Sequence, residues 1–259
     1  MTLLPCGGVP PARSGGKDRQ DAEGRMLHPE LLHPHQARLP RPAAVARVPE
    51  GLASRLPADW IHDGGLRAFR ADAGYLGRSI AALKLYLTLV VSQDPAAPAG
   101  ASAPIVLSYE RIAALSGLSD PLICAGKKAL LDQGLVTTDG ERPGGTISYR
   151  LAGLYPAAAA ARVLHAPQAG TRIAALHGLT CRKAPNLAAL KIYLLLSAQG
   201  SDPDGVASLD IDAASGLTNV SHVKVAAALT VLQDLGLAET LPGSSRAAEE
   251  RRVHLLPLR

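Results

Sequence analysis

The chain repeats itself: three short segments occur twice, in the same order. Ala82-Leu-Lys-Leu-Tyr86 returns almost unchanged as Ala189-Leu-Lys-Ile-Tyr193. The other two matches pair Ser116-Gly-Leu-Ser119 with Ser215-Gly-Leu-Thr218, and Asp132-Gln-Gly-Leu135 with Asp234-Leu-Gly-Leu237. Self-similarity of this kind is the sequence signature of repeated structural units. We therefore predict two copies of one unit, with a first domain over residues 51–155 and a second over residues 168–259.

Within the first copy, the sequence predicts the order helix, turn, helix, strand, hairpin, strand. Ser108 is suited to cap a short helix, because its hydroxyl can accept a hydrogen bond from a free backbone amide of the first turn. Gly117 supplies the turn between the helices, since glycine adopts a positive φ at little cost. Leu135–Thr138 and Thr146–Leu151 have strand composition and flank a turn-rich stretch. This order resembles a winged helix-turn-helix unit, whose second helix usually enters a DNA groove.

The composition fits a mainly helical protein. Hydrophobic residues make up 47% of the 259 residues but aromatic residues only 3%, so the cores must consist largely of aliphatic side chains. Leucine and alanine are strong helix formers, and two units of this size can each bury a core. We predict a mainly α fold with small β-hairpin wings, an α+β protein of two tandem winged-helix domains.

Two segments lie outside the predicted domains. Residues 1–50 are rich in Pro, Gly, Arg and His and poor in large apolar groups, so burial cannot offset the entropy of ordering them. We predict a disordered tail there. Residues 156–167 begin with proline and continue with a run of alanines, which favours a short helical linker between the domains.

Charge and cysteine content narrow the functional classes. A formal net charge of +5 permits nucleic-acid binding without requiring it. The three cysteines are widely spaced and form no C-x-x-C pair, which argues against a disulfide framework or a metal site. No apolar run approaches the ~20 residues needed to cross a bilayer. We expect a cytoplasmic protein with no cofactor, no bound metal and no membrane contact.

Motifs of the common enzyme classes are missing from the sequence. The chain has no phosphate-binding G-x-x-x-x-G-K-S/T loop, no G-x-S-x-G nucleophile elbow and no H-E-x-x-H zinc motif. Its Ser, His and Asp residues show no spacing that implies a catalytic triad. We therefore expect a protein without enzymatic activity.

The start of the second helix decides what a helix-turn-helix unit can read. In the first copy this stretch carries Asp120, Leu122 and Cys124, which are poor partners for base edges. Lys127 and Lys128 follow later in that helix, where they suit the phosphate backbone. The second copy offers side chains that can bond bases or phosphates, namely Asn219, Ser221, His222 and Lys224. The alternative is an ordinary capped and solvated helix start.

Further basic residues complete the predicted DNA-contacting set. Those of the hairpin tips and their return strands are Arg142, Arg150, Arg246, Arg251 and Arg252. Lys84 and Lys191 occupy equivalent positions in the first helices of the two copies. They contact phosphate or, alternatively, belong to a solvated face and lay their aliphatic stems on the core.

The tandem arrangement of residues 61–259 is similar to that of plasmid-type replication initiators and, for a single unit, to bacterial winged-helix transcriptional regulators. The resemblance rests on the pattern of elements, and the Ser-Gly-Leu-Ser turn and the Gly-Leu-Val exit at residues 134–136 are found across many winged-helix families. It implies double-stranded DNA as the partner, in transcription regulation or in replication initiation of a mobile element, and it allows a homodimer. The alternative is a protein-interaction module of paired winged helices, as in chromosome-condensation accessory subunits, without sequence-specific DNA reading.

Overall fold

The computed structural model describes residues 53–94, 103–142, 145–153, 163–165, 172–200, 205–241 and 250–258. Residues 53–55, 141–142 and 163–165 are described by their backbone alone. The predicted disordered tail over residues 1–50 lies outside the described residues, as do Arg246 and most of the predicted linker helix.

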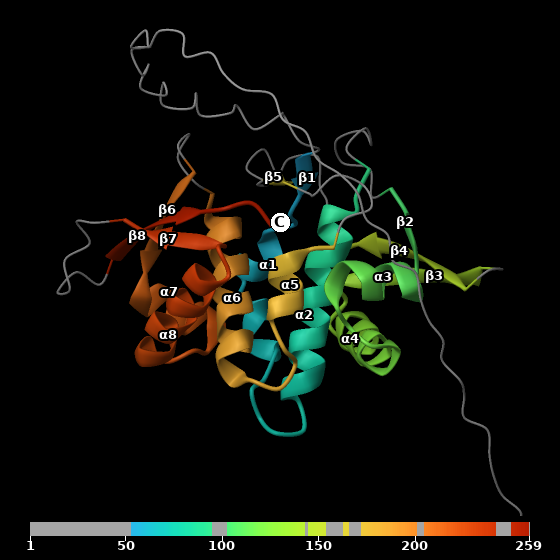
Figure 1. Ribbon diagram of the computed structural model, residues 1–259, viewed down its shortest axis with the longest axis horizontal. Helices are drawn as coiled ribbons and strands as arrows, with labels where there is room; N and C mark the ends of the chain where they lie inside the picture. The colour runs from blue at the N-terminus through green and yellow to red at the C-terminus, as the bar shows by residue number, and fades with distance from the viewer. Residues whose placement is uncertain are drawn as a thin grey trace, which may run out of the picture. The chain divides into compact units, whose positions relative to one another are not determined.

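Two units with the same order of elements follow each other along the chain (Figure 1). The first unit consists of α2 (Leu76–Val91), β2 (Ile105–Ser108), α3 (Tyr109–Ser116), α4 (Asp120–Asp132), β3 (Val136–Arg142) and β4 (Thr146–Leu151). The second unit consists of α6 (Ala184–Gln199), β6 (Val206–Asp210), α7 (Ile211–Thr218), α8 (His222–Asp234), β7 (Ala238–Thr240) and β8 (Glu250–Leu255). The predicted fold class, mainly helical with two small sheets, is confirmed.

Each unit closes with a three-stranded antiparallel sheet in which the last strand lies in the middle. The strand order is β2-β4-β3 in the first unit and β6-β8-β7 in the second. The two hairpins β3–β4 and β7–β8 are therefore equivalent, and each follows the second helix of a helix-turn-helix pair. Both units are winged-helix-like.

Side chains at the helix starts explain why α3 and α7 begin where they do. The hydroxyl of Ser108 accepts a 3.1 Å hydrogen bond from the backbone amide of Arg111, as its capping role requires. The carboxylate of Asp210 accepts the corresponding 2.9 Å bond from the amide of Ala213 in the second unit. The two eight-residue helices are thus fixed in the same way by different residues.

The turn between the two helices of each unit is made differently in the two copies. Gly117 adopts a φ of 70° after α3, as predicted. In the second unit Asn219 takes this left-handed conformation, with a φ of 53°, and Gly216 lies inside α7. The match between Ser116-Gly-Leu-Ser119 and Ser215-Gly-Leu-Thr218 is therefore out of structural register. When the turn at Gly117 is aligned with the turn at Asn219, α4 corresponds to α8 residue by residue, because both helices have thirteen residues.

The first helices of the two units form the centre of the protein. Figure 1 shows α2 and α6 side by side, running in the same direction, and the two helices pack on each other. Thirteen residues of each helix are buried, because α4 and α8 cover their outer sides. A helix that is apolar all round is expected in such a position. The two units therefore share one continuous core.

Helix α4 approaches α2 closely enough to require glycine at the crossing. A β-carbon at Gly126 would lie 2.9 Å from the carbonyl carbon and oxygen of Ala81. Contacts of that length with backbone atoms are forbidden to ordinary side chains, so the missing side chain sets the separation of the two helices.

The segments that precede the two units are exchanged between them. The segment before α2 contains α1 (Asp59–His62) and the 3₁₀ helix η1 (Gly65–Ala68), and the one before α6 contains α5 (Ala174–Gly178). Helix η1 packs on α7 of the second unit, where Arg67 donates a hydrogen bond to the carbonyl of Gly216. Reciprocally, α5 packs on α3 of the first unit, where a ring nitrogen of His177 lies 3.0 Å from the carbonyl oxygen of Ala114.

This reciprocity is the signature of a two-fold relation, in which each copy offers the other the same surface. Strand β1 (Ala53–Arg55) precedes α1 in the chain, and strand β5 (Val163–His165) precedes α5. The two strands pair with each other as an antiparallel ribbon. The predicted linker helix is thus wrong for residues 163–165, which pair as a strand with residues 53–55. The chain is arranged as a dimer is, within one polypeptide.

Candidate nucleic-acid interface

The start of α8 is the most exposed helix start of the two helix-turn-helix pairs. Ser221 occupies the cap position but makes no side-chain cap hydrogen bond, so the first backbone amides of the helix are not satisfied by it. His222, Val223 and Lys224 follow, all exposed, and Val223 exposes 82% of its surface. The inward side of the helix is held by the buried side chain of Val225 and three further apolar residues.

One of these exposed residues, His222, has a specific neighbour. The Nε2 atom of His222 lies 2.9 Å from a carboxylate oxygen of Asp212 in α7, and both side chains are more than half exposed. Asn219 is exposed at the turn that precedes α8. The structure therefore places Asn219, Ser221, His222 and Lys224 at one exposed helix start.

The start of α4 differs in chemistry. Asp120 and Cys124 are exposed there, and Leu122 is partly buried. The ammonium of Lys127 donates a 2.9 Å hydrogen bond to the hydroxyl of Tyr109 in α3, whose ring lies below it. Lys127 is thus held against the first unit, and Lys128 is the exposed lysine of this helix.

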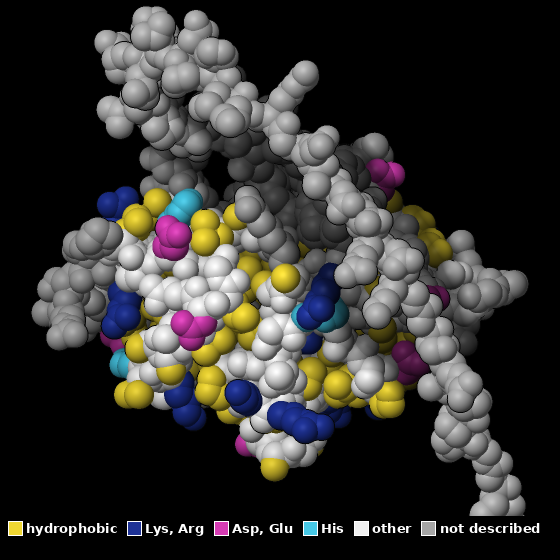
Figure 2. Space-filling model, viewed as in Figure 1, with side chains coloured by type: hydrophobic (Ala, Val, Ile, Leu, Met, Phe, Trp, Pro, Cys, Tyr) yellow, Lys and Arg dark blue, Asp and Glu magenta, His cyan; other side chains and the backbone are white. Residues whose placement is uncertain are grey.

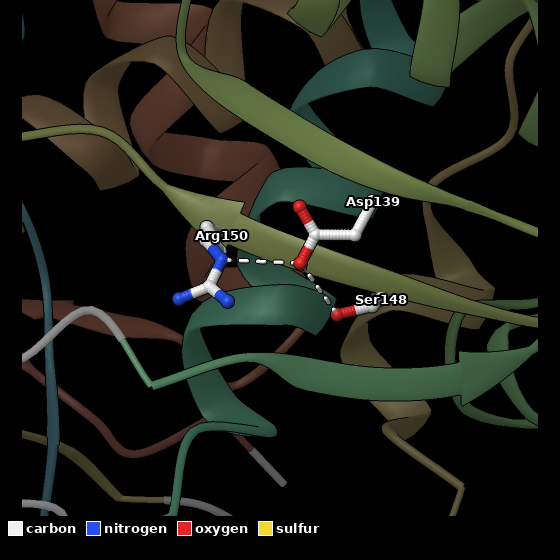
Figure 3. A network of polar contacts seen from close by, with 3 residues as sticks. All are labelled: Asp139, Ser148 and Arg150. Atoms are coloured by element: carbon white, nitrogen blue, oxygen red, sulfur yellow. Dashed lines mark hydrogen bonds and ion pairs between the residues drawn. The ribbon is translucent and has the colours of Figure 1, made fainter.

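The hairpin of the first unit carries a small polar network (Figure 3). The carboxylate of Asp139 on β3 accepts hydrogen bonds from Ser148, at 3.5 Å, and from the Nε atom of Arg150, at 3.2 Å. Ser148 and Arg150 are two residues apart on β4 and therefore lie on one side of the sheet. Because Arg150 is paired with an acid, this wing presents less positive charge than its sequence indicates.

The remaining wing arginines are described in part. Arg251 is partly buried and Arg252 exposed, on the middle strand β8 of the second sheet. Arg142 ends β3, and its side chain lies outside the described residues, as does the whole of Arg246.

Lys84 and Lys191 are buried, so the phosphate contact predicted for them and the alternative of a solvated face are both wrong. Their exposed fractions are 2% and 3%. The ammonium of Lys84 donates a 3.0 Å hydrogen bond to the carbonyl of Leu179, in the segment that leads into α6. That of Lys191 donates a 2.7 Å bond to the carbonyl of Thr218, at the end of α7. Burial lowers the pKa of both lysines, that of Lys191 to about 8. Both cations serve contacts inside the fold.

Basic residues that sequence reasoning missed lie where α2 and α6 begin. They are Arg70, Arg78, Arg182 and Lys183. Figure 2 shows several Lys and Arg side chains along this edge, at the bottom of the view. Two of the four are paired, Arg70 with Asp72 and Arg78 with Asp132 at the end of α4. The position of Arg182 and Lys183 just before the helix-starting proline was the signal available in the sequence.

Among the described residues, no helix is both long enough and apolar enough to cross a membrane. Comparison of the chain with protein-family models found no match, and comparisons with curated proteins and with solved structures found none either.

Proposed function

We propose that the protein binds double-stranded DNA, with α8 of the second unit in the major groove. The observation that carries this proposal is the start of α8, where exposed Asn219, His222 and Lys224 project next to backbone amides that Ser221 does not cap. Amide and imidazole side chains can bond base edges, whereas lysine and free backbone amides bind phosphate. Val223 adds an exposed apolar group of the kind that contacts the thymine methyl.

The first unit has a supporting role in this proposal. Asp120 at the start of α4 would repel phosphate. Leu122 and Cys124 are poor partners for base edges, so this helix is a poor reader of bases. Lys128 remains exposed and supplies a backbone contact. The second unit then confers sequence preference, and the first adds affinity without it.

The role that follows is that of a DNA-binding protein in transcription regulation or in replication initiation of a mobile element. Because the two units are related as in a dimer, one chain presents two helix-turn-helix pairs. A single polypeptide therefore suffices for bipartite binding, and a homodimer would add further contacts.

Fluorescence anisotropy on labelled duplex DNA at two salt concentrations tests the proposal. We expect binding that weakens as salt rises, because phosphate contacts release counterions. Lys128→Ala lowers the salt slope by about one. Lys84→Met removes a buried ammonium and leaves the slope unchanged, provided that circular dichroism shows a folded protein. A wild-type protein that binds no duplex at low salt refutes the proposal and favours the paired protein-interaction module.

A further inference from the structure

A pocket of about 250 Å³ opens beside the start of α8. Its walls come from three places in the chain: residues 69–72 before α2, the first half of α6, and the turn into α8. Phe69, Leu187 and Val220 provide apolar surface, and Lys191 lies at the wall formed by α6. The volume is below the roughly 300–1,000 Å³ of drug-sized ligand sites, so the pocket suits a small molecule.

At the equivalent turn of the first unit, a side chain of the other leading segment lies close by. There the ring of His177, from the segment before α6, lies against the turn after α3, so that a β-carbon at Gly117 would come within 2.7 Å of the ring. In the pocket, the corresponding stretch before α2 carries Arg70, which pairs with Asp72 and lies over the ring of Tyr75. The two units therefore carry different side chains here, His177 in the first and Arg70 in the second.

The charges around the pocket favour an anion. Arg70, Lys191 and Lys224 contribute three cations to its lining, against the single carboxylate of Asp72. Lys191 exposes only 3% of its surface. Its ammonium donates one of its three N–H groups to the carbonyl of Thr218. Desolvation makes such an ammonium a strong partner for an opposite charge.

We propose that this pocket binds a small organic anion, with a carboxylate or phosphate head at Lys191 and an apolar body against Phe69 and Leu187. Asn219, Val220 and Lys224 also line the pocket, so the bound anion touches the turn and helix start that face DNA in the proposed function. The anion is thus an effector that weakens DNA binding, because it adds negative charge beside Lys224, which contacts phosphate in the proposed function. This regulatory part rests on the proposed function, whereas ligand binding itself does not.

Calorimetric titration with three probes tests the site: benzoate and phenyl phosphate carry the two anionic heads, and neutral benzamide is the control. We expect at least one anion to bind at millimolar concentration or tighter, and benzamide to bind about tenfold more weakly or not at all. Lys191→Met should weaken the anion about tenfold or more, since a charge-assisted hydrogen bond is lost. Lys84→Met, which changes the equivalent lysine of the first unit and does not line this pocket, should bind as the wild type does.

Lys224→Ala provides a second variant, because this exposed side chain is not needed for folding. We expect several-fold weaker binding of the anion by this protein. The proposal is overturned if the wild type binds neither anion, if benzamide binds as well as benzoate, or if Lys191→Met and Lys224→Ala both bind as the wild type does.

The regulatory part is measured separately, with labelled duplex DNA and increasing amounts of the anion that binds. By linkage, an effector that lowers DNA affinity is itself bound more weakly in the presence of DNA, by the same factor. If DNA affinity does not change, the effector role is contradicted, but the assignment of the pocket as an anion site is not affected. A wild type that binds the anion but no DNA contradicts the proposed function alone.

Discussion

The ammonium of Lys191 lies 2.7 Å from the carbonyl oxygen of Thr218, and this bond joins the central helix α6 to the end of α7. The equivalent Lys84 reaches instead across to Leu179, in the segment that leads into the other unit. Two lysines at matching positions thus hold different contacts: one within its own unit and one between the two units. Each is buried with a carbonyl as its partner, which is a costly position for a charge.

The burial of Lys191 predicts a pH dependence of stability. Its pKa is lowered from 10.5 to about 8 by burial. Above pH 8 the folded protein releases this proton before the unfolded chain does, so the free energy of unfolding rises with pH until about 10.5. The contribution is at most about 1.4 kcal/mol per pH unit. Lys191→Met should lack this rise in urea unfolding measured between pH 7 and pH 10.

The charged groups that line the pocket with Lys191, namely Arg70, Asp72 and Lys224, are present in both proteins, so the comparison isolates Lys191. Lys128→Met removes an exposed lysine and should keep the wild-type slope. Parallel pH profiles of the wild type and Lys191→Met would show that Lys191 is not buried in solution.

Two glycine substitutions should have opposite effects on stability, one at the crossing of α2 and α4 and the other at an open position of α7. Gly126→Ala should destabilise the protein by about 1–3 kcal/mol, because the new methyl group meets backbone atoms of Ala81 at 2.9 Å. Gly216→Ala, inside α7 with no atom within 4 Å of the new group, should stabilise it by about 0.4–1 kcal/mol. Urea unfolding measures both. Equal effects in the two variants would contradict the close helix crossing.

The shared core predicts that the two units unfold together. Trp60, in α1, donates a 2.8 Å hydrogen bond to Tyr86 of the first unit, so its fluorescence reports on that unit. Leu232→Ala removes a fully buried side chain of the second unit and should cost about 2–5 kcal/mol. We expect the fluorescence and circular dichroism transitions to coincide and to shift equally. A Trp60 transition that stays in place would mean that the units are independent.

The left-handed turn at Asn219 predicts a graded response to substitution. Asn219→Gly should be tolerated, since glycine adopts a φ of this sign freely. Asn219→Ala should cost about 1–2 kcal/mol. Thermal unfolding compares the two, and equal stability would show that the turn has another conformation.

Local signals in the sequence were sufficient for the helix-turn-helix pair and the return strand of the first unit, but they did not reveal the strands β2 and β6 that precede each pair. The hydroxyl of Ser108 caps α3, and the predicted strand Thr146–Leu151 is β4 as observed. The Ser-Gly-Leu match failed because short polar motifs recur by chance, and an asparagine can replace glycine in a left-handed turn. Only the three-dimensional alignment of α4 with α8 shows this.

The relation between the units could not be predicted in the same way. Whether a lysine in an apolar helix is solvated depends on what covers the helix, and α2 and α6 cover each other. The unbroken apolar residues around Lys84 were a signal of full burial. The exchange of Arg67 and His177 between the units arises from contacts distant in sequence, which periodicity does not encode.

The base preference of α8 is the central claim, and one measurement tests it most directly. A duplex selected from a random pool and its scrambled counterpart are compared by anisotropy, for the wild type and for Asn219→Gly combined with His222→Ala. The glycine keeps the turn, so the helix remains in place. We predict that the double variant loses about tenfold or more of the preference for the selected duplex. A double variant that keeps the full wild-type preference would contradict the claim that α8 reads the sequence.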